Sequence, residues 1–341
     1  MSSARGVVVK KSAIRNSYKI ILTSIICYLI GIIFYSFDPL MQSFPSIITD
    51  QLMRTFAISS VGIGFVTASY YYSYNLMQIP AGILCDLHGT RKILFFSSIA
   101  CTIGLLLFSF STLVDEIIIS RILMGLGASC AAVILVDISK EYFSVTYLPI
   151  LVGIAQFAGN IGSICGQLPL SIVSDIYGWR TSILMLAIIP ISVIIFTFLF
   201  MKNSAYDSSH KEYILKAIQK LKEVLLNKVN WLIALYAMFL WAPFYSFSSL
   251  WGIMLLKSTL NLSVENASKL IAISWIGSGI GSILIGMWSS YINKRKICIF
   301  FSAFLGLIVF PTILFSNSLM GISVFLFIFG MASAGQALSF A

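Results

Sequence analysis

The segment Gly82–Lys92, which reads GILCDLHGTRK, lies between two long apolar runs. It places Asp86, Gly89 and the adjacent cations Arg91 and Lys92 in one short stretch. A chain that crosses a membrane repeatedly makes such polar turns in water, where a glycine ends one helix and charged residues precede the next. The segment therefore predicts a turn between two membrane-spanning helices.

The same pattern recurs as GMWSSYINKRK at residues 286–296, again next to apolar runs. The first glycine and the last two cations keep their places, whereas Ser290 and Asn293 stand at the positions of the acid and the second glycine. A second match joins residues 34–37 to 244–247, because both read Phe-Tyr-Ser-Phe. Two matches at similar spacing predict a chain built from two duplicated helical halves.

The composition excludes a soluble protein. Hydrophobic residues make up 59% of the 341 residues and charged residues only 10%, whereas soluble domains carry about 25% charged residues. The net charge of +10 does not indicate nucleic-acid binding, because the cations cluster between apolar runs. The six cysteines are scattered without a C-x-x-C pair, so we expect neither a metal site nor a disulfide framework. No catalytic or nucleotide-binding motif is present, and we expect no enzyme activity and no cofactor.

Ten apolar segments are long enough to cross a bilayer, which requires about 20 residues. They are 20–43, 59–83, 92–113, 116–139, 148–173, 181–201, 231–256, 267–291, 297–316 and 319–341. Between the sixth and the seventh, apolar residues alternate with lysines at helical spacing over 214–225. This pattern predicts a basic amphipathic helix on the membrane surface. A solvated linker with helical tendency explains the same pattern.

The Gly82–Lys92 segment resembles the loop signature of the major facilitator superfamily, with Thr90 in place of one of its usual cations. Arg121, Gly125 and Gly127 similarly resemble the fourth-helix motif of that superfamily. The resemblance implies a transporter with the fold of that family, an all-α integral membrane protein made of two pseudo-symmetric six-helix halves.

The resemblance also implies where the halves begin and end. The first half would be residues 1–201, followed by a cytoplasmic linker at 202–230 and a second half at 231–341. The second half would hold about four helices instead of six, as in a chain truncated after its tenth helix.

The distribution of positive charge predicts the orientation. If the N-terminus is cytoplasmic, most of the 22 Lys and Arg residues lie on the cytoplasmic side. The exceptions are Arg54, Arg121, Arg180, Lys257 and Lys269. Because Lys and Arg are enriched in cytoplasmic loops, we expect cytoplasmic termini and a cytoplasmic linker. The abundance of Ile, Lys, Asn and Ser suggests an AT-rich bacterial genome and hence the inner membrane.

Two charges fall at membrane depth, where ionisable side chains are costly and usually functional. Asp38 lies late in the first predicted helix, before Pro39, and Arg121 lies about a turn into the fourth. The resemblance implies that these helices line a central cavity. We expect Arg121 to bind a carboxylate or phosphate of the solute, with Asp38 as its counter-ion and proton carrier. A structural pair at the outer helix ends is the alternative.

Other polar and aromatic side chains within apolar segments could complete a solute site. A pocket for a small polar solute needs a few hydrogen-bonding groups on apolar walls. The candidates are Tyr35, Asn75, Gln78, Gln156, Asn160, Trp241 and Tyr245. Packing between helices is the alternative for each of them. Glycines at helical intervals in 153–166 and 277–286 predict close helix packing.

The resemblance implies a cytoplasmic gate at the turn itself. Its residues would be Gly82, Asp86, Gly89, Arg91 and Lys92, together with Asp137 on the fourth helix and Arg295 in the second turn. Such a cluster would latch the two halves together in the outward-facing state. A role in membrane topology alone is the alternative, above all for Lys92.

These patterns predict a secondary transporter that moves a small polar, anionic solute by alternating access, with protons as the candidate coupling ion. Organic acids, sugar acids, sugar phosphates and amino-acid derivatives fit this description. Two alternatives stay open: a multidrug-type exporter, suggested by the aromatic interior, and a transport-inactive sensor or scaffold, suggested by the incomplete second half. We expect a monomer whose partners are its solute and membrane lipid.

Overall fold

The computed structural model describes residues 2–144, 147–202, 219, 221–292, 295–315 and 318–335. Every secondary-structure element within these ranges is a helix, which confirms the predicted all-α class. The predicted amphipathic helix at 214–225 lies largely outside the described residues.

The first group of helices runs from the N-terminus to residue 200. Its members are α1 (Ser2–Ser43), α2 (Pro45–Phe56), α3 (Ser60–His88), α4 (Thr90–Phe110), α5 (Val114–Ala128), α6 (Ala131–Tyr142), α7 (Leu148–Cys165), α8 (Leu168–Tyr177), α9 (Trp179–Leu186) and α10 (Ile188–Phe200). The second group comprises α12 (Lys228–Ser246), the π-helix η2 (Phe247–Trp251), α13 (Gly252–Leu260), α14 (Val264–Ile292), α15 (Arg295–Phe315) and α16 (Leu319–Ser333).

Each of the ten predicted apolar segments is largely helical in the part that the structure describes. In the described part of the chain, seven helices are long and apolar enough to cross a membrane: 21–43, 90–110, 114–142, 150–177, 179–200, 228–260 and 264–285. Shorter apolar helices, at 296–312 and 319–333, match the last two segments. The remaining segment is α3, which is less apolar because it carries four tyrosines, an asparagine and a glutamine.

Two of the predicted spans are not continuous α-helices. One is interrupted near a proline, and the other contains a π-helix, which has one more residue per hydrogen-bonded turn than an α-helix. The fifth span divides into α7 and α8, and Pro169 near the start of α8 has no N–H to donate to the preceding turn. The seventh span passes through the five-residue π-helix η2. Helix α2 was not predicted at all. It starts with Pro45, a residue favoured at the first helical position.

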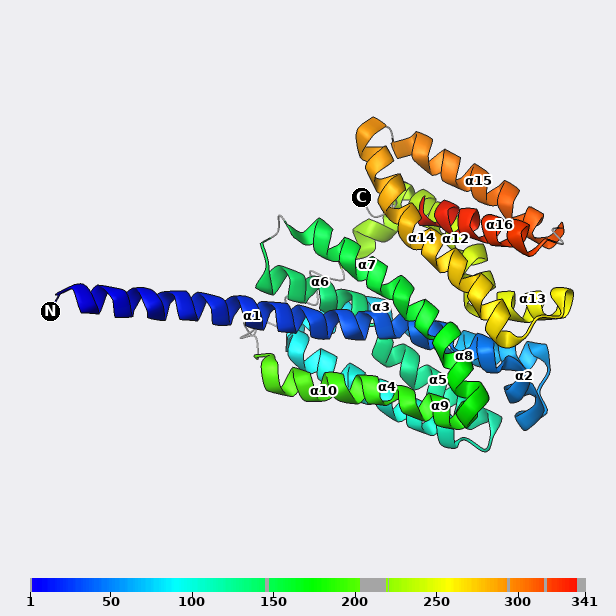
Figure 1. Cartoon of the computed structure of the whole chain (residues 1–341), viewed down its shortest axis with the longest axis horizontal. Helices are drawn as coiled ribbons and strands as arrows, with labels where there is room; N and C mark the ends of the chain where they lie inside the picture. The colour runs from blue at the N-terminus through cyan, green and yellow to red at the C-terminus, as the bar shows by residue number, and fades with distance from the viewer. Residues whose placement is uncertain are drawn as a thin grey trace.

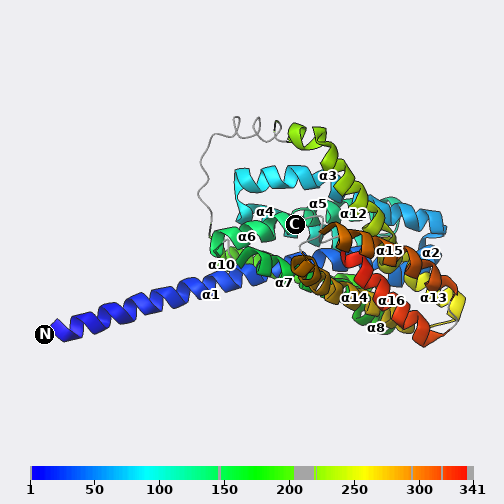
Figure 2. The same ribbon diagram turned by 90° about the horizontal axis from the view of Figure 1, so that it is seen from above.

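The two groups meet along one side of each and contact mainly at one end (Figure 1). We call this the α2 end: it holds α2, α8 and α13, and α2 contacts α13 and η2 there. The opposite end, which we call the Gly89 end, holds the turn between α3 and α4. Towards this end α14 and α15 diverge from α6 and α7 (Figure 1). Helix α1 projects beyond the bundle in both views (Figures 1 and 2).

Glycines allow the closest helix contacts in both groups. A Cβ on Gly162 of α7 would lie 1.9 Å from the carbonyl oxygen of Ser36 on α1. A Cβ on Gly277 of α14 would lie 2.2 Å from the carbonyl oxygen of Phe327 on α16. The predicted small-residue faces are therefore confirmed at these two positions. The prediction is wrong for Gly153, where an added Cβ would meet nothing within 4 Å.

Candidate functional site

Asp38 is buried in the first helix group and accepts two hydrogen bonds. Its side chain is 6% exposed. The amide Nε2 of Gln42, one turn further along α1, donates to Asp38 Oδ1 over 2.7 Å. The hydroxyl of Tyr70 on α3 donates to the same oxygen over 2.5 Å. A carboxylate at this depth needs such donors, because the hydrocarbon around it offers none.

Arg121 on α5 is completely buried. Its guanidinium lies 4.5 Å from the centre of the Tyr70 ring and 5.2 Å from the centre of the Phe44 ring. One nitrogen, Nη1, donates to the carbonyl oxygen of Met41 over 2.8 Å, whereas Nε and Nη2 have no hydrogen-bond partner. The two aromatic faces partly compensate the buried charge. Two buried donors remain without an acceptor, a costly arrangement in a protein interior.

The Met41 carbonyl is free to accept this bond because of the local sequence. In an α-helix it would accept from the N–H four residues later, but that residue is Pro45, which has none. Helix α1 ends at Ser43 and α2 starts at Pro45. Helix α1 continues through Pro39, which has no N–H to donate to the turn before it.

Asp38 and Arg121 are not joined by a direct ion pair within the described ranges, and the role of Asp38 as counter-ion to Arg121 stays a prediction. Both contact Tyr70, which binds Asp38 through its hydroxyl and Arg121 through its ring face. Sequence reasoning placed the two charges at similar depth but could not select this tyrosine from its neighbours. Tyr70 is fully buried, whereas Tyr72 is 66% exposed.

The other predicted solute-site residues divide into three sets. Tyr35 donates its hydroxyl to Gln156 Oε1 over 3.2 Å, which joins α1 to α7. Asn160 is 5% exposed, and its Nδ2 has no partner. Asn75 and Gln78 are exposed on α3. The structure therefore brings Asn160 into the interface between the groups. Gln78 interacts with Tyr74, which also interacts with Asp38, and the places of Asn75 and Gln78 in a solute site stay predictions.

Aromatic rings from α3, α12 and α14 connect the two groups. Tyr71 on α3 packs edge-on against Tyr245 on α12, with ring centres 6.4 Å apart. Tyr245 also contacts Trp241 at 5.3 Å and Trp275 of α14 at 5.5 Å. The predicted residues Trp241 and Tyr245 thus belong to an aromatic cluster that spans the interface.

Polar contacts also cross between the groups at the α2 end. Gln167, fully buried at the start of α8, donates from Nε2 to the carbonyl oxygen of Ser248 in η2 over 2.6 Å and to Ser46 Oγ over 3.2 Å. Lys257 of α13 forms an ion pair with Asp50 of α2. Sequence reasoning missed both contacts. The only available signal was that Asp50 and Lys257 carry opposite charges near predicted outer ends.

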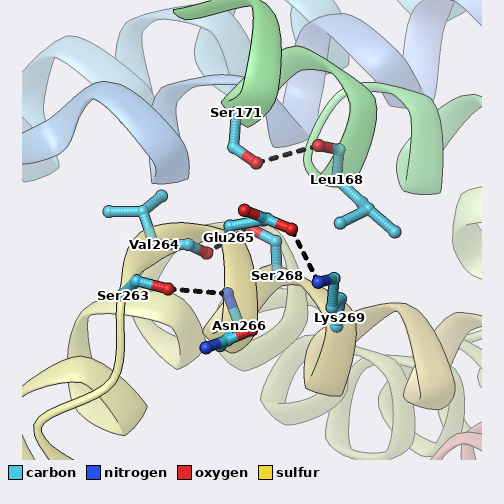
Figure 3. A network of polar contacts seen from close by, with 8 residues as sticks. All are labelled: Leu168, Ser171, Ser263, Val264, Glu265, Asn266, Ser268 and Lys269. Carbon is cyan, nitrogen blue, oxygen red and sulfur yellow. Dashed lines mark hydrogen bonds and ion pairs between the residues drawn. The ribbon is translucent and has the colours of Figure 1, made fainter. Parts of the chain in front are cut away.

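Where α8 faces the start of α14, the hydrogen bonds and ion pair drawn stay within each helix (Figure 3). Ser171 Oγ donates to the carbonyl oxygen of Leu168 over 2.8 Å on α8. On α14, Lys269 Nζ pairs with Glu265 Oε1 at 2.6 Å. This part of the interface is held by side-chain packing, which leaves Gln167–Ser248 and Asp50–Lys257 as the polar links described between the two groups.

This architecture has counterparts among known proteins. The sequence profile of the Major Facilitator Superfamily matches residues 20–341. The chain belongs to the major facilitator superfamily. Its structure is similar to that of a bacterial homolog of the human lysosomal transporter Spinster, solved inward-facing and unoccupied. The TM-score is 0.73, with 17% identity over 93% of this chain and 74% of that chain. For a D-xylose–proton symporter the TM-score is 0.64, with 16% identity over 93% of this chain and 85% of that one. These likenesses show the fold alone.

Two curated proteins that are similar in sequence are considerably longer than this chain. A hexuronate transporter of Bacillus subtilis (strain 168) is 23% identical over 275 residues, which are 79% of this chain and 64% of that protein. The probable anion transporter 6 of Arabidopsis thaliana, a chloroplastic protein, is 25% identical over 220 residues, or 61% of this chain and 41% of that protein. The chain therefore spans less than two thirds of either relative. The family and these names point to a transporter, not an enzyme.

The superfamily loop at the Gly89 end is ordered within the first group. Gly89 has a φ of 82°, which an L-residue rarely adopts, so glycine is required between α3 and α4. Arg91 Nη2 donates to the carbonyl oxygen of Phe198 on α10 over 3.0 Å. Lys92 is exposed, and Asp86 and Asp137 are half-buried on α3 and α6. An added Cβ on Gly82 would meet nothing within 4 Å. The side chain of Arg295 lies outside the described part of the chain.

The buried charges of the first group have uncharged counterparts at the matching positions of the second group. In register with the shared Phe-Tyr-Ser-Phe, Ser248 of η2 takes the place that Asp38 has in α1. Asp38 is bonded to Tyr70 of α3, and Ser248 Oγ is correspondingly bonded to Ser274 Oγ of α14 over 3.1 Å. Leu326 of α16 stands where α5 has Arg121. Among these matched positions, only the first group retains the ionisable pair.

Proposed function

We propose that this protein is a secondary active transporter that moves a small polar anion across a membrane by alternating access. The observation that carries the proposal is Arg121, a completely buried cation with two unpartnered donor nitrogens. A guanidinium offers paired N–H groups that match a carboxylate or phosphate. The names of two relatives, a hexuronate transporter and a probable anion transporter, support the same class.

Asp38 is the proposed carrier of the coupling proton. Its carboxyl group is buried and bonded to Tyr70, and the same tyrosine covers the guanidinium of Arg121. A change of charge on Asp38 would alter the Tyr70 hydroxyl bond and so the ring that covers Arg121. Binding of the anion and transfer of the proton would thereby be linked through one side chain.

We infer that the conformation described is inward-facing. The groups contact at the α2 end through Gln167–Ser248 and Asp50–Lys257, and their helices diverge at the Gly89 end (Figure 1). The bias of Lys and Arg supports a cytoplasmic location for the Gly89 end. Arg91 bonds to the carbonyl oxygen of Phe198 on α10 of its own group at this end. The proposed setting is the inner membrane of a bacterium, with the chain acting as a monomer among lipids.

Uptake into liposomes tests the proposal. The purified chain is reconstituted with an inward proton gradient and offered radiolabelled organic acids, sugar acids and sugar phosphates. Arg121→Leu, which installs the residue of the duplicated position, should abolish anion uptake, and Arg121→Lys should retain part of it because the charge remains. Anion uptake that is unchanged in Arg121→Leu would contradict the proposal.

Export of amphipathic compounds is the second candidate function. The cluster of Tyr71, Tyr245, Trp241 and Trp275 favours it, because aromatic walls bind apolar solutes without a charge partner. This function predicts resistance to several unrelated compounds in cells that express the chain. The resistance should be the same for wild type and Arg121→Leu.

A further inference from the structure

Two buried hydrogen-bond donors at the interface between the groups have no acceptor in the protein. Asn160 of α7 is 5% exposed and Trp275 of α14 is 1% exposed. Asn160 Nδ2 and Trp275 Nε1 both lack a partner. An unsatisfied buried donor destabilises the folded state, so it is retained only where something compensates. The indole N–H can only donate, and its missing partner must therefore be an acceptor.

The two donors lie over the same face of α14. Gly279 follows Trp275 by one helical turn, and residues four apart share a face. A Cβ on Gly279 would lie 3.3 Å from Asn160 Nδ2 and 3.8 Å from Phe157 of α7. Asn160 therefore projects towards the part of α14 that lies directly beside Trp275. Glycine at this position leaves the space that the amide occupies.

Aromatic rings border this position on the other side. Trp275 packs edge-on against Phe244 at 5.1 Å and against Tyr245 at 5.5 Å. Tyr245 in turn contacts Tyr71 of the first group. A pair of neutral donors beside flat apolar rings is the combination that suits a hydroxylated carbon skeleton, with hydroxyl oxygens as acceptors and C–H groups on the rings.

We propose that Asn160 and Trp275 form a subsite that binds hydroxyl oxygens of the solute between the two groups. This subsite rests on the proposed function and narrows the solute class to hydroxylated organic acids. The hydroxyl groups of the solute would accept hydrogen bonds from Asn160 and Trp275, and its carboxylate would bind Arg121. Both donors lie on helices that separate or approach when the groups move. The subsite is complete only while α7 and α14 are in contact.

The test uses the purified 341-residue chain in lipid nanodiscs and two probes, D-glucuronate and succinate. Both are carboxylates, but only glucuronate carries hydroxyls on a ring. Binding is measured by calorimetry for wild type, Asn160→Asp and Trp275→Phe. Asn160→Asp keeps the shape and replaces the donor by an acceptor, and Trp275→Phe keeps a ring and removes the N–H. Ser163→Ala is the matched control, because Ser163 is another buried α7 residue with an unpartnered hydroxyl.

We expect each donor variant to weaken glucuronate binding about tenfold, the equivalent of one lost hydrogen bond. Succinate binding and the Ser163→Ala variant should be unchanged. Gly279→Ala should also weaken glucuronate binding, because its methyl group would crowd the Asn160 amide without removing any polar group. Glucuronate should change the tryptophan fluorescence of wild type, and this change should be absent in Trp275→Phe.

Equal glucuronate affinity in wild type and both donor variants would overturn the subsite. So would failure of glucuronate to bind while succinate binds and is transported, a result that leaves the proposed function intact. If neither anion binds and no anion is taken up into liposomes, both the subsite and the proposed function are wrong. Equal weakening of glucuronate and succinate binding would also overturn the subsite. Asn160 and Trp275 would then affect closure of the protein and would not bind the hydroxyl groups of the solute.

Discussion

Replacing Gln167 by leucine tests whether a single side-chain amide holds the α2 end closed. Gln167 is fully buried, and its Nε2 bonds Ser248 of η2 and Ser46 of α2, whereas its Oε1 has no partner. In Gln167→Leu the Ser248 carbonyl loses its side-chain donor, but the unsatisfied Oε1 disappears. These two effects are of similar size, about 1–3 kcal/mol each, and nearly cancel.

What remains is the loss of the neutral hydrogen bond to Ser248, because Ser46 belongs to the same group as Gln167 and its bond does not depend on closure. One such bond contributes about 1 kcal/mol, so the closed state should lose about 1 kcal/mol relative to the open state. At about 1.4 kcal/mol per factor of ten, the ratio of open to closed molecules should rise about fivefold. The ion pair Asp50–Lys257 matters less. Its side chains are 39% and 40% exposed, and such pairs contribute about 0–1 kcal/mol.

Distances between spin labels on α2 and α13 measure this equilibrium. Labels at Thr55 and Ser258 lie on exposed positions of these contacting helices, in a background without the native cysteines. Gln167→Leu should raise the ratio of the longer-distance to the shorter-distance population about fivefold, and Asp50→Asn should have a smaller effect that vanishes in high salt. Ser171→Ala is the control, because its hydroxyl bonds only within α8 (Figure 3). A distribution for Gln167→Leu that matches Ser171→Ala would refute the reasoning.

Three further substitutions have outcomes that follow from single contacts. Asp38→Asn should abolish proton-driven uptake but leave exchange of labelled for unlabelled solute, and retained accumulation at a pH gradient would exclude Asp38 as the proton carrier. Gly89→Ala should lower thermal stability in detergent by about 1–3 kcal/mol, because φ 82° with ψ 146° is a conformation that residues with a Cβ rarely adopt. The control Gly82→Ala should be neutral or stabilising, since its Cβ meets nothing within 4 Å. Gly162→Val should prevent α1 and α7 from packing, because even a Cβ would lie 1.9 Å from the Ser36 oxygen. Size-exclusion chromatography of that variant as a monodisperse, wild-type-like peak would contradict this.

The helices could be predicted from the sequence because hydropathy is a local property. Each apolar segment has to satisfy its own backbone hydrogen bonds in lipid, and a helix is the way a single segment does so. The same reasoning missed α2 and the π-helix η2. Helix α2 is short and only half apolar, with Asp50 and Arg54 among its residues. Within the π-helix, the carbonyl of Ser248 accepts a hydrogen bond from Gln167, which comes from a distant segment that no local pattern contains.

Asp38 and Arg121 could be chosen as candidate site residues from the sequence, because a charged side chain within an apolar segment is costly whatever the orientation of its helix. Asp38 and Arg121 are buried as expected, but their roles in transport stay predictions. Asn75 and Gln78 looked equally suitable in the sequence and are exposed. Residue type reports how costly burial would be. It does not report which way a side chain faces when neighbouring residues on one helix are all polar or aromatic.

Sequence alone was enough for the membrane class, the duplicated turn and the family resemblance, all of which depend on residue types at short or repeated spacing. The contacts of the site depend instead on how helices rotate and slide against one another. Tyr70 meets both Asp38 and Arg121 because α3 packs against α5 at one rotation, set in part by Gly125, which admits the backbone of α3. The Gln167 amide reaches Ser248 only because two distant segments meet at the α2 end. Such contacts join residues that are far apart in the chain, and their geometry arises from the packing of the whole bundle.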